Sequence, residues 1–223
     1  MQQELTYPIR VVYSKTGRSR YISHLDTMRT ITRALRRSGL AFWYTQGFNP
    51  HLYLTFPLPL ALGVESLCEI VDLRLTKQME LDDVKSEISA QFPPGFEIKS
   101  IATPSLPTTA IAWAEYKLTL TPAQNELGEM AEKMRELFGQ QTILVSKKSK
   151  KGEQLIDILP HAQLLGVEII EGRLVVVLRL AAGTSLNISP RLVLKAFCTN
   201  AVPPESVSIL RTRVLDSHLE NFR

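Results

Sequence analysis

The sequence predicts an α+β protein built from two tandem domains with antiparallel sheets, and three observations carry this prediction. Segments of alternating β-branched residues and segments of helical spacing follow one another in the order β-α-β-β-α-β. An uncharged stretch rich in proline and hydroxyl residues then interrupts the chain at 103–109. After it, the same order of elements begins again. This order is that of the ferredoxin-like (βαββαβ) unit, in which two helices cover one face of a four-stranded sheet.

The first half supplies six elements. In chain order we expect a strand at 9–15, a helix at 24–38, strands at 41–45 and 66–76, a helix at 80–92 and a strand at 96–102. The first helix has clear boundary signals. Ser23 and Asp26 form a capping box, in which the hydroxyl accepts from the amide of Asp26 and the carboxylate returns to the amide of Ser23. Gly39 stands where helices commonly end.

Helical spacing of 100° per residue gives this first helix two neighbouring stripes. The stripe that we expect to be buried consists of Leu25, Met28, Ile31, Thr32 and Leu35. The stripe that we expect to be exposed consists of Arg29, Arg33, Arg36 and Arg37. The sequence therefore predicts four guanidinium groups on one side of a single helix.

The second half repeats the order with different residues. We expect a strand at 115–121, a helix from 127 that closes at Gly139, strands at 142–148 and 173–181, a helix after Ser189-Pro190 to about 199, and a strand at 207–216. The region 142–172 has room for an additional strand or helix. We accordingly divide the chain into an N-terminal domain at 1–102, a linker at 103–114 and a C-terminal domain at 115–223.

Composition narrows the class of protein. Of the 223 residues 44% are apolar, and no apolar run approaches the roughly 20 residues that cross a bilayer. The N-terminus lacks the pattern of a signal peptide. Cys68 and Cys198 support neither a disulfide framework nor a cysteine metal site, so we expect a cytoplasmic protein without a membrane partner. Two thiolates are also too few to ligate an iron–sulfur cluster.

Positive charge is concentrated in one window. Between positions 10 and 37 there are eight basic residues and one acid, whereas the whole chain carries only +4. A one-sided cationic surface is typical of proteins that bind an anionic partner, and RNA is the first candidate. No DNA specificity is evident. The alternative is a solvated face whose arginines pair with Glu65, Glu69 or Asp72.

A loop at 46–51, QGFNPH, adds aromatic and polar groups. An exposed Phe48 would stack on a base, while Asn49 and His51 would supply hydrogen bonds. Alternatively, Phe48 fills the core, and Gly47 and Asn49 supply unusual backbone angles. We expect nucleic-acid or phosphate binding from Lys15, Arg18, Arg20, Arg29, Arg33, Arg36, Arg37, Gln46, Phe48, Asn49 and His51.

Catalytic and metal-binding signals are weak. His24 and His51 are the candidate general bases. A set of possible metal ligands consists of His24, Asp26, His51, Glu69 and Asp72, but its spacing matches no ligand motif, and we expect no metal. A lysine-rich hairpin tip at 147–152 is either a solvated loop or an extension of the nucleic-acid surface.

The motifs of the first half resemble those of a known family. The residues SHLD at 23–26, RALRR at 33–37, GFNPH at 47–51 and LGVE at 62–65 are similar, in order and spacing, to the bacterial radical SAM-linked protein family. This is a domain of unknown function found fused to, or encoded beside, radical S-adenosylmethionine (SAM) proteins. The similarity is dense over 10–75 and weaker afterwards.

The resemblance implies a radical SAM protein as partner. That partner would hold the iron–sulfur cluster and S-adenosylmethionine, and no cofactor is expected in this chain. We therefore expect a non-catalytic module that binds RNA and presents it to the partner. Two alternatives stay open, namely an RNA-processing or RNA-modifying enzyme with a histidine base and a pure protein-interaction subunit.

Overall fold

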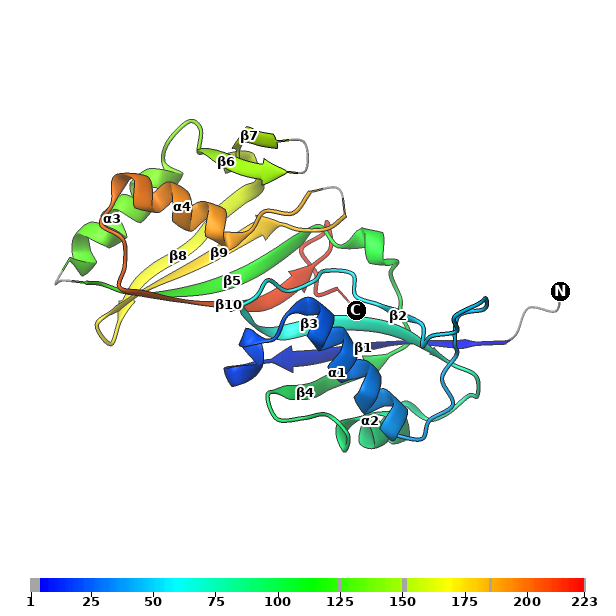
Figure 1. Ribbon diagram of the computed structural model, residues 1–223. Helices are drawn as coiled ribbons and strands as arrows, with labels where there is room; N and C mark the ends of the chain where they lie inside the picture. Colours follow the sequence, from blue (N-terminus) through cyan, green and yellow to red (C-terminus); the bar gives the residue numbers. More distant parts are fainter. Residues whose placement is uncertain (1–4, 124–125, 150–151, 185, 223) are drawn as a thin grey trace. The chain divides into compact units, whose positions relative to one another are not determined.

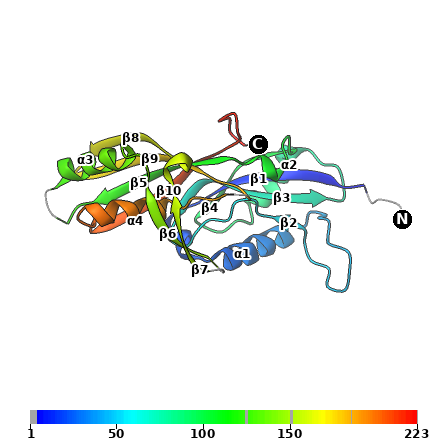
Figure 2. The ribbon, with the colours of Figure 1, turned by 90° about the horizontal axis from the view of Figure 1, so that it is seen from above.

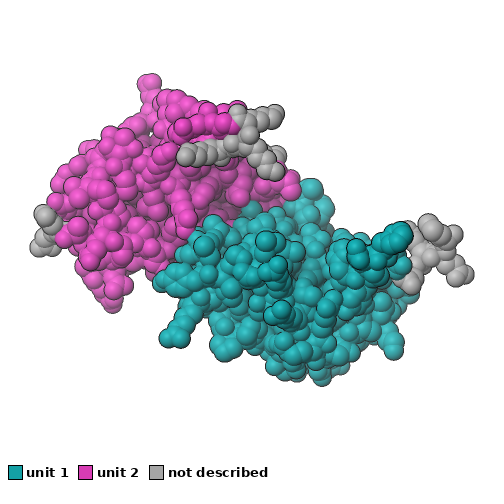
Figure 3. Space-filling model, in the orientation of Figure 1, with its two compact units in different colours: residues 1–110, 221–223 teal, residues 111–220 magenta. Residues whose placement is uncertain are grey.

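The computed structural model describes residues 5–123, 126–149, 152–184 and 186–222, and these form an α+β protein, as the sequence predicts. The chain divides into two compact units (Figure 3). Unit 1 comprises Met1–Ala110 with Asn221–Arg223, and unit 2 comprises Ile111–Glu220. The domain boundaries expected from the sequence stay a prediction. Among the described residues, no helix has the length and apolar character needed to span a membrane.

Unit 1 contains four strands and two α-helices (Figure 1). In chain order they are β1 (Tyr7–Lys15), α1 (His24–Arg37), β2 (Leu54–Thr55), β3 (Glu65–Leu75), α2 (Leu81–Ser89) and β4 (Phe96–Ala102), with a short 3-10 helix, η1 (Gly17–Tyr21), before α1. β1 pairs antiparallel with both β3 and β4. β2 and β1 both pair with Leu73 and Asp72, so they lie on opposite edges of β3. The strand order in this unit is therefore β4-β1-β3-β2.

Both helices of unit 1 cover the same face of its sheet. Alternate residues of β1 and β3 point toward them, because side chains of a strand alternate between the two faces. The core formed there includes Ile9, Val11, Tyr13, Val71, Leu73 and Leu75 from these strands, Ile31 and Leu35 from α1, and Val84 and Ile88 from α2.

One element predicted in unit 1 is wrong. Residues 41–45 do not form a regular strand but make two isolated bridges, Phe42 with Leu75 and Tyr44 with Leu52. The segment pairs with the end of β3 through Phe42 and, after the chain turns back at 46–50, with its own returning part through Tyr44 and Leu52. The place beside β3 is taken by β2 instead.

The described residues of unit 2 form six strands and two α-helices. They are β5 (Trp113–Thr121), α3 (Leu127–Phe138), β6 (Leu144–Ser149), β7 (Gly152–Asp157), β8 (Ala162–Ile170), β9 (Arg173–Ala181), α4 (Pro190–Asn200) and β10 (Ser206–Leu215). A short 3-10 helix, η3 (Leu159–His161), precedes β8. Another, η2 (Thr108–Ala110), belongs to unit 1. The strand order is β10-β5-β9-β8, and each of these pairs is antiparallel.

The predicted strand at 142–148 is displaced from its expected place in unit 2. It exists as β6 but pairs with β7 as a separate two-stranded hairpin, seen beside α4 in Figures 1 and 2. The strand next to β9 is β8, from the region 142–172, where we expected an additional element. β8 begins at Ala162, whose side chain is buried, whereas the first four residues of β7 are exposed.

Candidate nucleic-acid interface

Helix α1 begins at a side-chain cap. The Ser23 hydroxyl accepts from the amide of Asp26 at 3.2 Å, as predicted. The return bond differs from the prediction, because the Asp26 carboxylate accepts from the Ser23 hydroxyl at 2.7 Å. This hydrogen bond, and a second from Arg29, hold the pKa of Asp26 below its usual value. A charged carboxylate therefore lies at the positive end of the helix dipole.

The buried face of α1 is turned relative to the predicted stripe. Its fully buried side chains are those of Thr27, Ile31, Ala34 and Leu35. Leu25, predicted to be buried, has 63% of its surface exposed. Thr27 and Ala34, which were not in the predicted stripe, are buried instead.

This rotation of α1 about its axis places apolar and cationic side chains together on the outer face of the helix. Six residues line a hollow of about 360 Å³: Leu25, Met28, Arg29, Thr32, Arg33 and Arg36. Three of the four predicted arginines thus share one surface, which we call the arginine hollow. A guanidinium fork can donate to two phosphate oxygens at once, and the neighbouring apolar groups offer contact to a base or sugar.

The cations of this region differ in how far they are neutralised. Arg29 lies 3.1 Å from the Asp26 carboxylate. Arg37 turns away from the hollow and donates to the carbonyl of Gln91 at 2.8 Å and to its side chain at 3.4 Å. Arg33 is exposed and has no ion pair or hydrogen bond to any residue that the structure describes. Of the predicted helix arginines, Arg33 and Arg36 are therefore the ones best placed to take an external anion.

The cations that precede α1 divide in the same way. Arg18 is exposed. Arg20 lies 3.5 Å from Glu65 and places its guanidinium over the ring of Tyr21 at 4.8 Å. The alternative expectation of pairing with sheet carboxylates thus holds for Arg20.

Lys15 was predicted to contact phosphate, and its placement argues against this role. Its side chain is buried, and Nζ donates to the carbonyl of Ile22 at 2.9 Å. Burial lowers the pKa of the Lys15 ammonium, an effect that nearby Glu69 opposes. Lys15 lies on β1 on the face that the helices cover, so it cannot reach an external ligand without unfolding around it.

The segment 42–53 forms an arm whose base is fixed to β3. The amide of Trp43 donates to the carbonyl of Arg74 at 2.8 Å, and the amide of Tyr53 donates to the carbonyl of Trp43 at 3.2 Å. The guanidinium of Arg74 lies 5.5 Å from the ring of Trp43 and 4.8 Å from that of Tyr53. Both distances lie within the range of cation–π interactions, which stabilise exposed aromatic clusters. We call this segment the aromatic arm.

The tip of the aromatic arm carries the predicted loop residues. Phe48 is fully exposed, which excludes a place in the core. Gln46 and Asn49 are exposed as well. Gly47 has φ +133°, a backbone angle that other residues rarely adopt. The His51 ring is held at Nδ1, 3.0 Å from the Thr45 hydroxyl and 3.2 Å from the carbonyl of Asn49.

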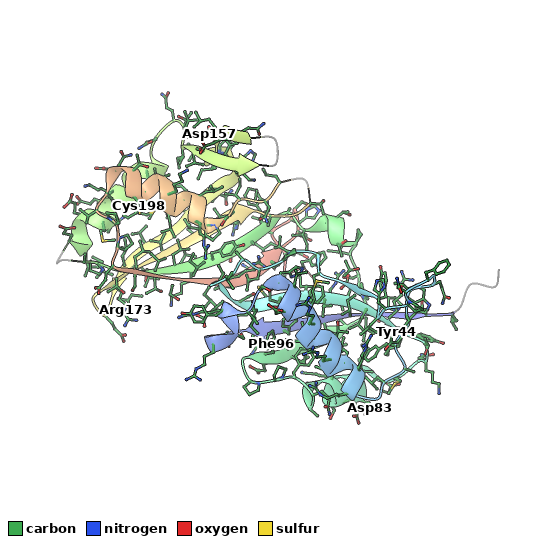
Figure 4. All side chains as sticks on the ribbon, viewed as in Figure 1. Tyr44, Asp83, Phe96, Asp157, Arg173 and Cys198 are labelled. Carbon is green, nitrogen blue, oxygen red and sulfur yellow. The ribbon has the colours of Figure 1, made fainter. Side chains whose placement is uncertain are left out.

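The arm and the helix meet at Tyr44. The Arg36 guanidinium lies 6.0 Å from the centre of its ring. Figure 4 shows Tyr44 on the segment between α1 and β2. The site residues predicted from the sequence did not include Trp43, Tyr44, Tyr53 or Arg74. The sequence does contain five aromatic residues between 42 and 53. Which of these rings face solvent could not be predicted without knowing how the segment pairs with β3.

The proposed metal ligands do not come together. Asp72 takes two hydrogen bonds of 2.7 Å from Arg10, and Asp26 is bound to Ser23 and Arg29. In the described parts of the chain, no three histidine, cysteine, aspartate or glutamate side chains form a group that could hold a metal.

His24 is half-buried and lies edge-on to Phe56, with ring centres 5.5 Å apart. Burial lowers the pKa of His24, and Lys15 lowers it further, while Glu69 opposes both. The neutral form of the imidazole is thus favoured at the first residue of α1, where His24 lies near the buried side chains of Lys15 and Glu69. His24 therefore lies in surroundings typical of a residue with a structural role.

The lysine-rich hairpin tip is described only in part. Lys147 donates to the carbonyl of Asn187 at 3.3 Å. Lys150 and Lys151 lie outside the described residues, so the predicted extension of the nucleic-acid surface stays a prediction.

Comparison with known proteins identifies a family. The model of a family described as "Uncharacterized protein conserved in bacteria (DUF2344)" matches residues 8–190. No protein with a curated description matches the chain.

Three solved structures show distant similarity. A Cbf5-Nop10-Gar1 complex gives a TM-score of 0.48 at 12% identity, over 92% of this chain and 48% of that one, so the chain spans about half its length. An unknown protein from Galdieria sulphuraria gives 0.29 at 14% identity, over 93% and 99%. A CRISPR-associated protein from Thermus thermophilus gives 0.24 at 16% identity, over 91% and 98%.

Proposed function

The chain belongs to the DUF2344 family, and we propose that it is an RNA-binding accessory module that presents its RNA to a radical SAM enzyme. We further infer that each unit is a ferredoxin-like domain. The strand orders β4-β1-β3-β2 and β10-β5-β9-β8, with both helices of unit 1 on one face, support this inference.

One observation carries the RNA-binding proposal. Arg33 and Arg36 project from one face of α1 into the arginine hollow, and neither has a carboxylate partner among the described residues. Arg29 adds a third, partly neutralised guanidinium. Exposed arginines at spacings of three and four residues follow one side of a helix and can contact consecutive phosphates of one strand.

The proposal predicts a steep dependence of RNA affinity on salt. Each phosphate contact contributes roughly −0.7 to the slope of log K against log salt for a single strand. We expect the double variant Arg33→Ala/Arg36→Ala to lose affinity and to flatten the slope by roughly 1.4. The measurement is fluorescence anisotropy of a labelled RNA over a range of salt concentrations.

The matched control is Arg173→Ala, which removes an exposed arginine from the start of β9 (Figure 4). It should leave the affinity and the slope close to those of the unchanged protein. A loss in Arg173→Ala about half that in the double variant, in proportion to the one charge removed against two, would mean that the chain binds RNA only through its overall charge. Absence of salt-sensitive RNA binding would overturn the proposal in favour of a pure protein-interaction subunit.

The proposal of a radical SAM partner rests on two points. The motifs at 23–65 resemble those of the radical SAM-linked family, and the two cysteines of this chain are too few to ligate an iron–sulfur cluster. Its test is an affinity purification of the tagged protein with and without nuclease, followed by mass spectrometry. We expect a radical SAM protein to be retained after nuclease treatment. Recovery of RNA without any such protein would remove the partner from the proposal.

A further inference from the structure

The aromatic arm is electrically neutral although it stands beside the arginine hollow. From Ser38 to Val64 the chain contains no lysine, arginine, aspartate or glutamate. Any affinity that the arm contributes to an RNA complex is therefore independent of counterion release. The helix and the arm offer an RNA two different kinds of contact.

The arm is also held in a fixed position before any ligand binds. Its base is tied to β3 by the bond from the Trp43 amide to the carbonyl of Arg74, and by the Arg74 guanidinium, which contacts the rings of both Trp43 and Tyr53. Its tip is closed by the bond from the Thr45 amide to the carbonyl of His51 at 2.8 Å, and by the two contacts of the His51 ring. A rigid aromatic group loses little conformational freedom on binding.

The exposed rings of the arm are placed to meet bases. Phe48 has its whole side chain in solvent, and Tyr44 is 37% exposed with its ring beside the Arg36 guanidinium. Arg36 also lines the arginine hollow. A strand whose phosphates follow Arg33 and Arg36 would consequently carry its bases toward Tyr44, the residue through which the arm contacts α1. Phe48, on the same arm, offers a second exposed ring.

We propose that the aromatic arm stacks on unpaired bases and restricts the RNA ligand of this surface to single-stranded RNA, an inference that rests on the function proposed above. In a duplex the bases are already stacked on one another, and the deep, narrow major groove keeps side chains from reaching them. Only an unpaired strand can offer its bases to Phe48 while its backbone contacts α1. Stacking on an aromatic side chain requires no particular base, so the selection is for single strands and not for a sequence.

The test compares one RNA as a single strand and as a duplex of equal length. We expect the single strand to bind more tightly to the unchanged protein. Phe48→Ala should weaken single-strand binding about tenfold. It should leave duplex binding and the salt slope unchanged, because no charge is removed. Phe48 is fully exposed, so the substitution leaves the folded core intact.

Two further variants separate stacking from protein docking. Phe48→Tyr keeps a ring and should retain single-strand affinity, while Phe48→Leu keeps apolar bulk without a ring and should lose affinity as Phe48→Ala does. Leu155→Ala, at another exposed apolar position on β7, is the matched control and should change nothing.

The outcomes distinguish the two proposals. If RNA binds with the predicted salt dependence but Phe48→Ala has no effect, or if single strand and duplex bind equally, the arm has no stacking role and the RNA-binding module stands. If Phe48→Ala instead abolishes retention of a partner protein and leaves RNA affinity unchanged, the arm is a protein-docking element. If no RNA binds at all, both proposals fail.

Discussion

The two units use arginine in opposite ways. In unit 2, Arg179 donates twice to one oxygen of Glu115, at 2.8 and 3.1 Å, and Arg213 lies 3.4 Å from the other oxygen. Glu115 has only 9% of its side chain exposed. In unit 1, Arg33 and Arg36 lie on the outer face of α1 without such a carboxylate among the described residues.

The difference follows from the kind of element that carries the arginine. Glu115 stands directly opposite Arg179 on β9 and Arg213 on β10, so the pairing of three strands brings the charges together. Arg10 and Asp72 of unit 1 are opposite each other in the same way, on β1 and β3. The outer face of a helix has no neighbouring strand to supply an acid. Arg33 and Arg36 of α1 are consequently without a carboxylate among the described residues, whereas Arg10, Arg179 and Arg213 of the sheets each face one.

The largest expected effect comes from breaking the compensated group. Glu115→Ala leaves two guanidinium groups without their carboxylate, one of them with only 17% of its side chain exposed. We expect a loss of about 3 kcal/mol in the free energy of unfolding, measured by urea denaturation. Glu168→Ala, an exposed acid on β8, is the control and should change stability by less than about 0.5 kcal/mol. Equal stabilities for the two variants would contradict the comparison.

A second substitution converts a compensated arginine on α1 into a free one. Asp26→Asn removes the charge that faces Arg29 and keeps the Ser23 cap. Because an additional guanidinium becomes available, we expect tighter RNA binding and a salt slope steeper by roughly 0.7. Thermal stability should fall slightly, since a negative charge is lost from the first turn of the helix.

The double variant Asp26→Asn/Arg29→Ala is the control for this effect. It should return the salt slope to that of the unchanged protein, because the freed guanidinium is removed again. A slope that stays steep in the double variant would show that Asp26 acts on RNA through general repulsion and not through Arg29.

The sequence predicted much of the fold because its signals are local. Alternation and helical spacing placed β4 and β9 at their observed bounds, and the cap at Ser23 and Gly39 bounded α1. What it could not supply is register. The basic window from 10 to 37 includes Arg10 and Lys15, and only the pairing of β1 with β3 shows that both are internal.

The candidate site was predicted in the same uneven way. Helical spacing predicted four arginines on one side of α1. Arg29, Arg33 and Arg36 line the arginine hollow, whereas Arg37 turns away to Gln91. Helical spacing also assigned Leu25 to the core, because spacing gives the angle between residues but not the direction of the sheet. The base of the aromatic arm depends on Arg74, which lies 21 residues beyond Tyr53 and is joined to it only by the fold.

The smallest expected effect concerns His24, the half-buried first residue of α1, whose imidazole is partly desolvated near Lys15 and Glu69. Burial lowers the pKa of His24 in the folded chain, so the unfolded chain binds the proton more readily. Folding stability should therefore be complete above the ordinary histidine pKa of about 6.5 and should fall as the pH drops below it. We expect His24→Gln to flatten the dependence of the melting temperature on pH between about 8 and 5, whereas His218→Gln, at an exposed position, should leave it unchanged. An unaltered pH dependence in His24→Gln would mean that the proton responsible for it binds at another residue. It would also mean that a charged imidazole is accommodated near Lys15 and Glu69 as readily as the guanidinium groups are in the arginine hollow.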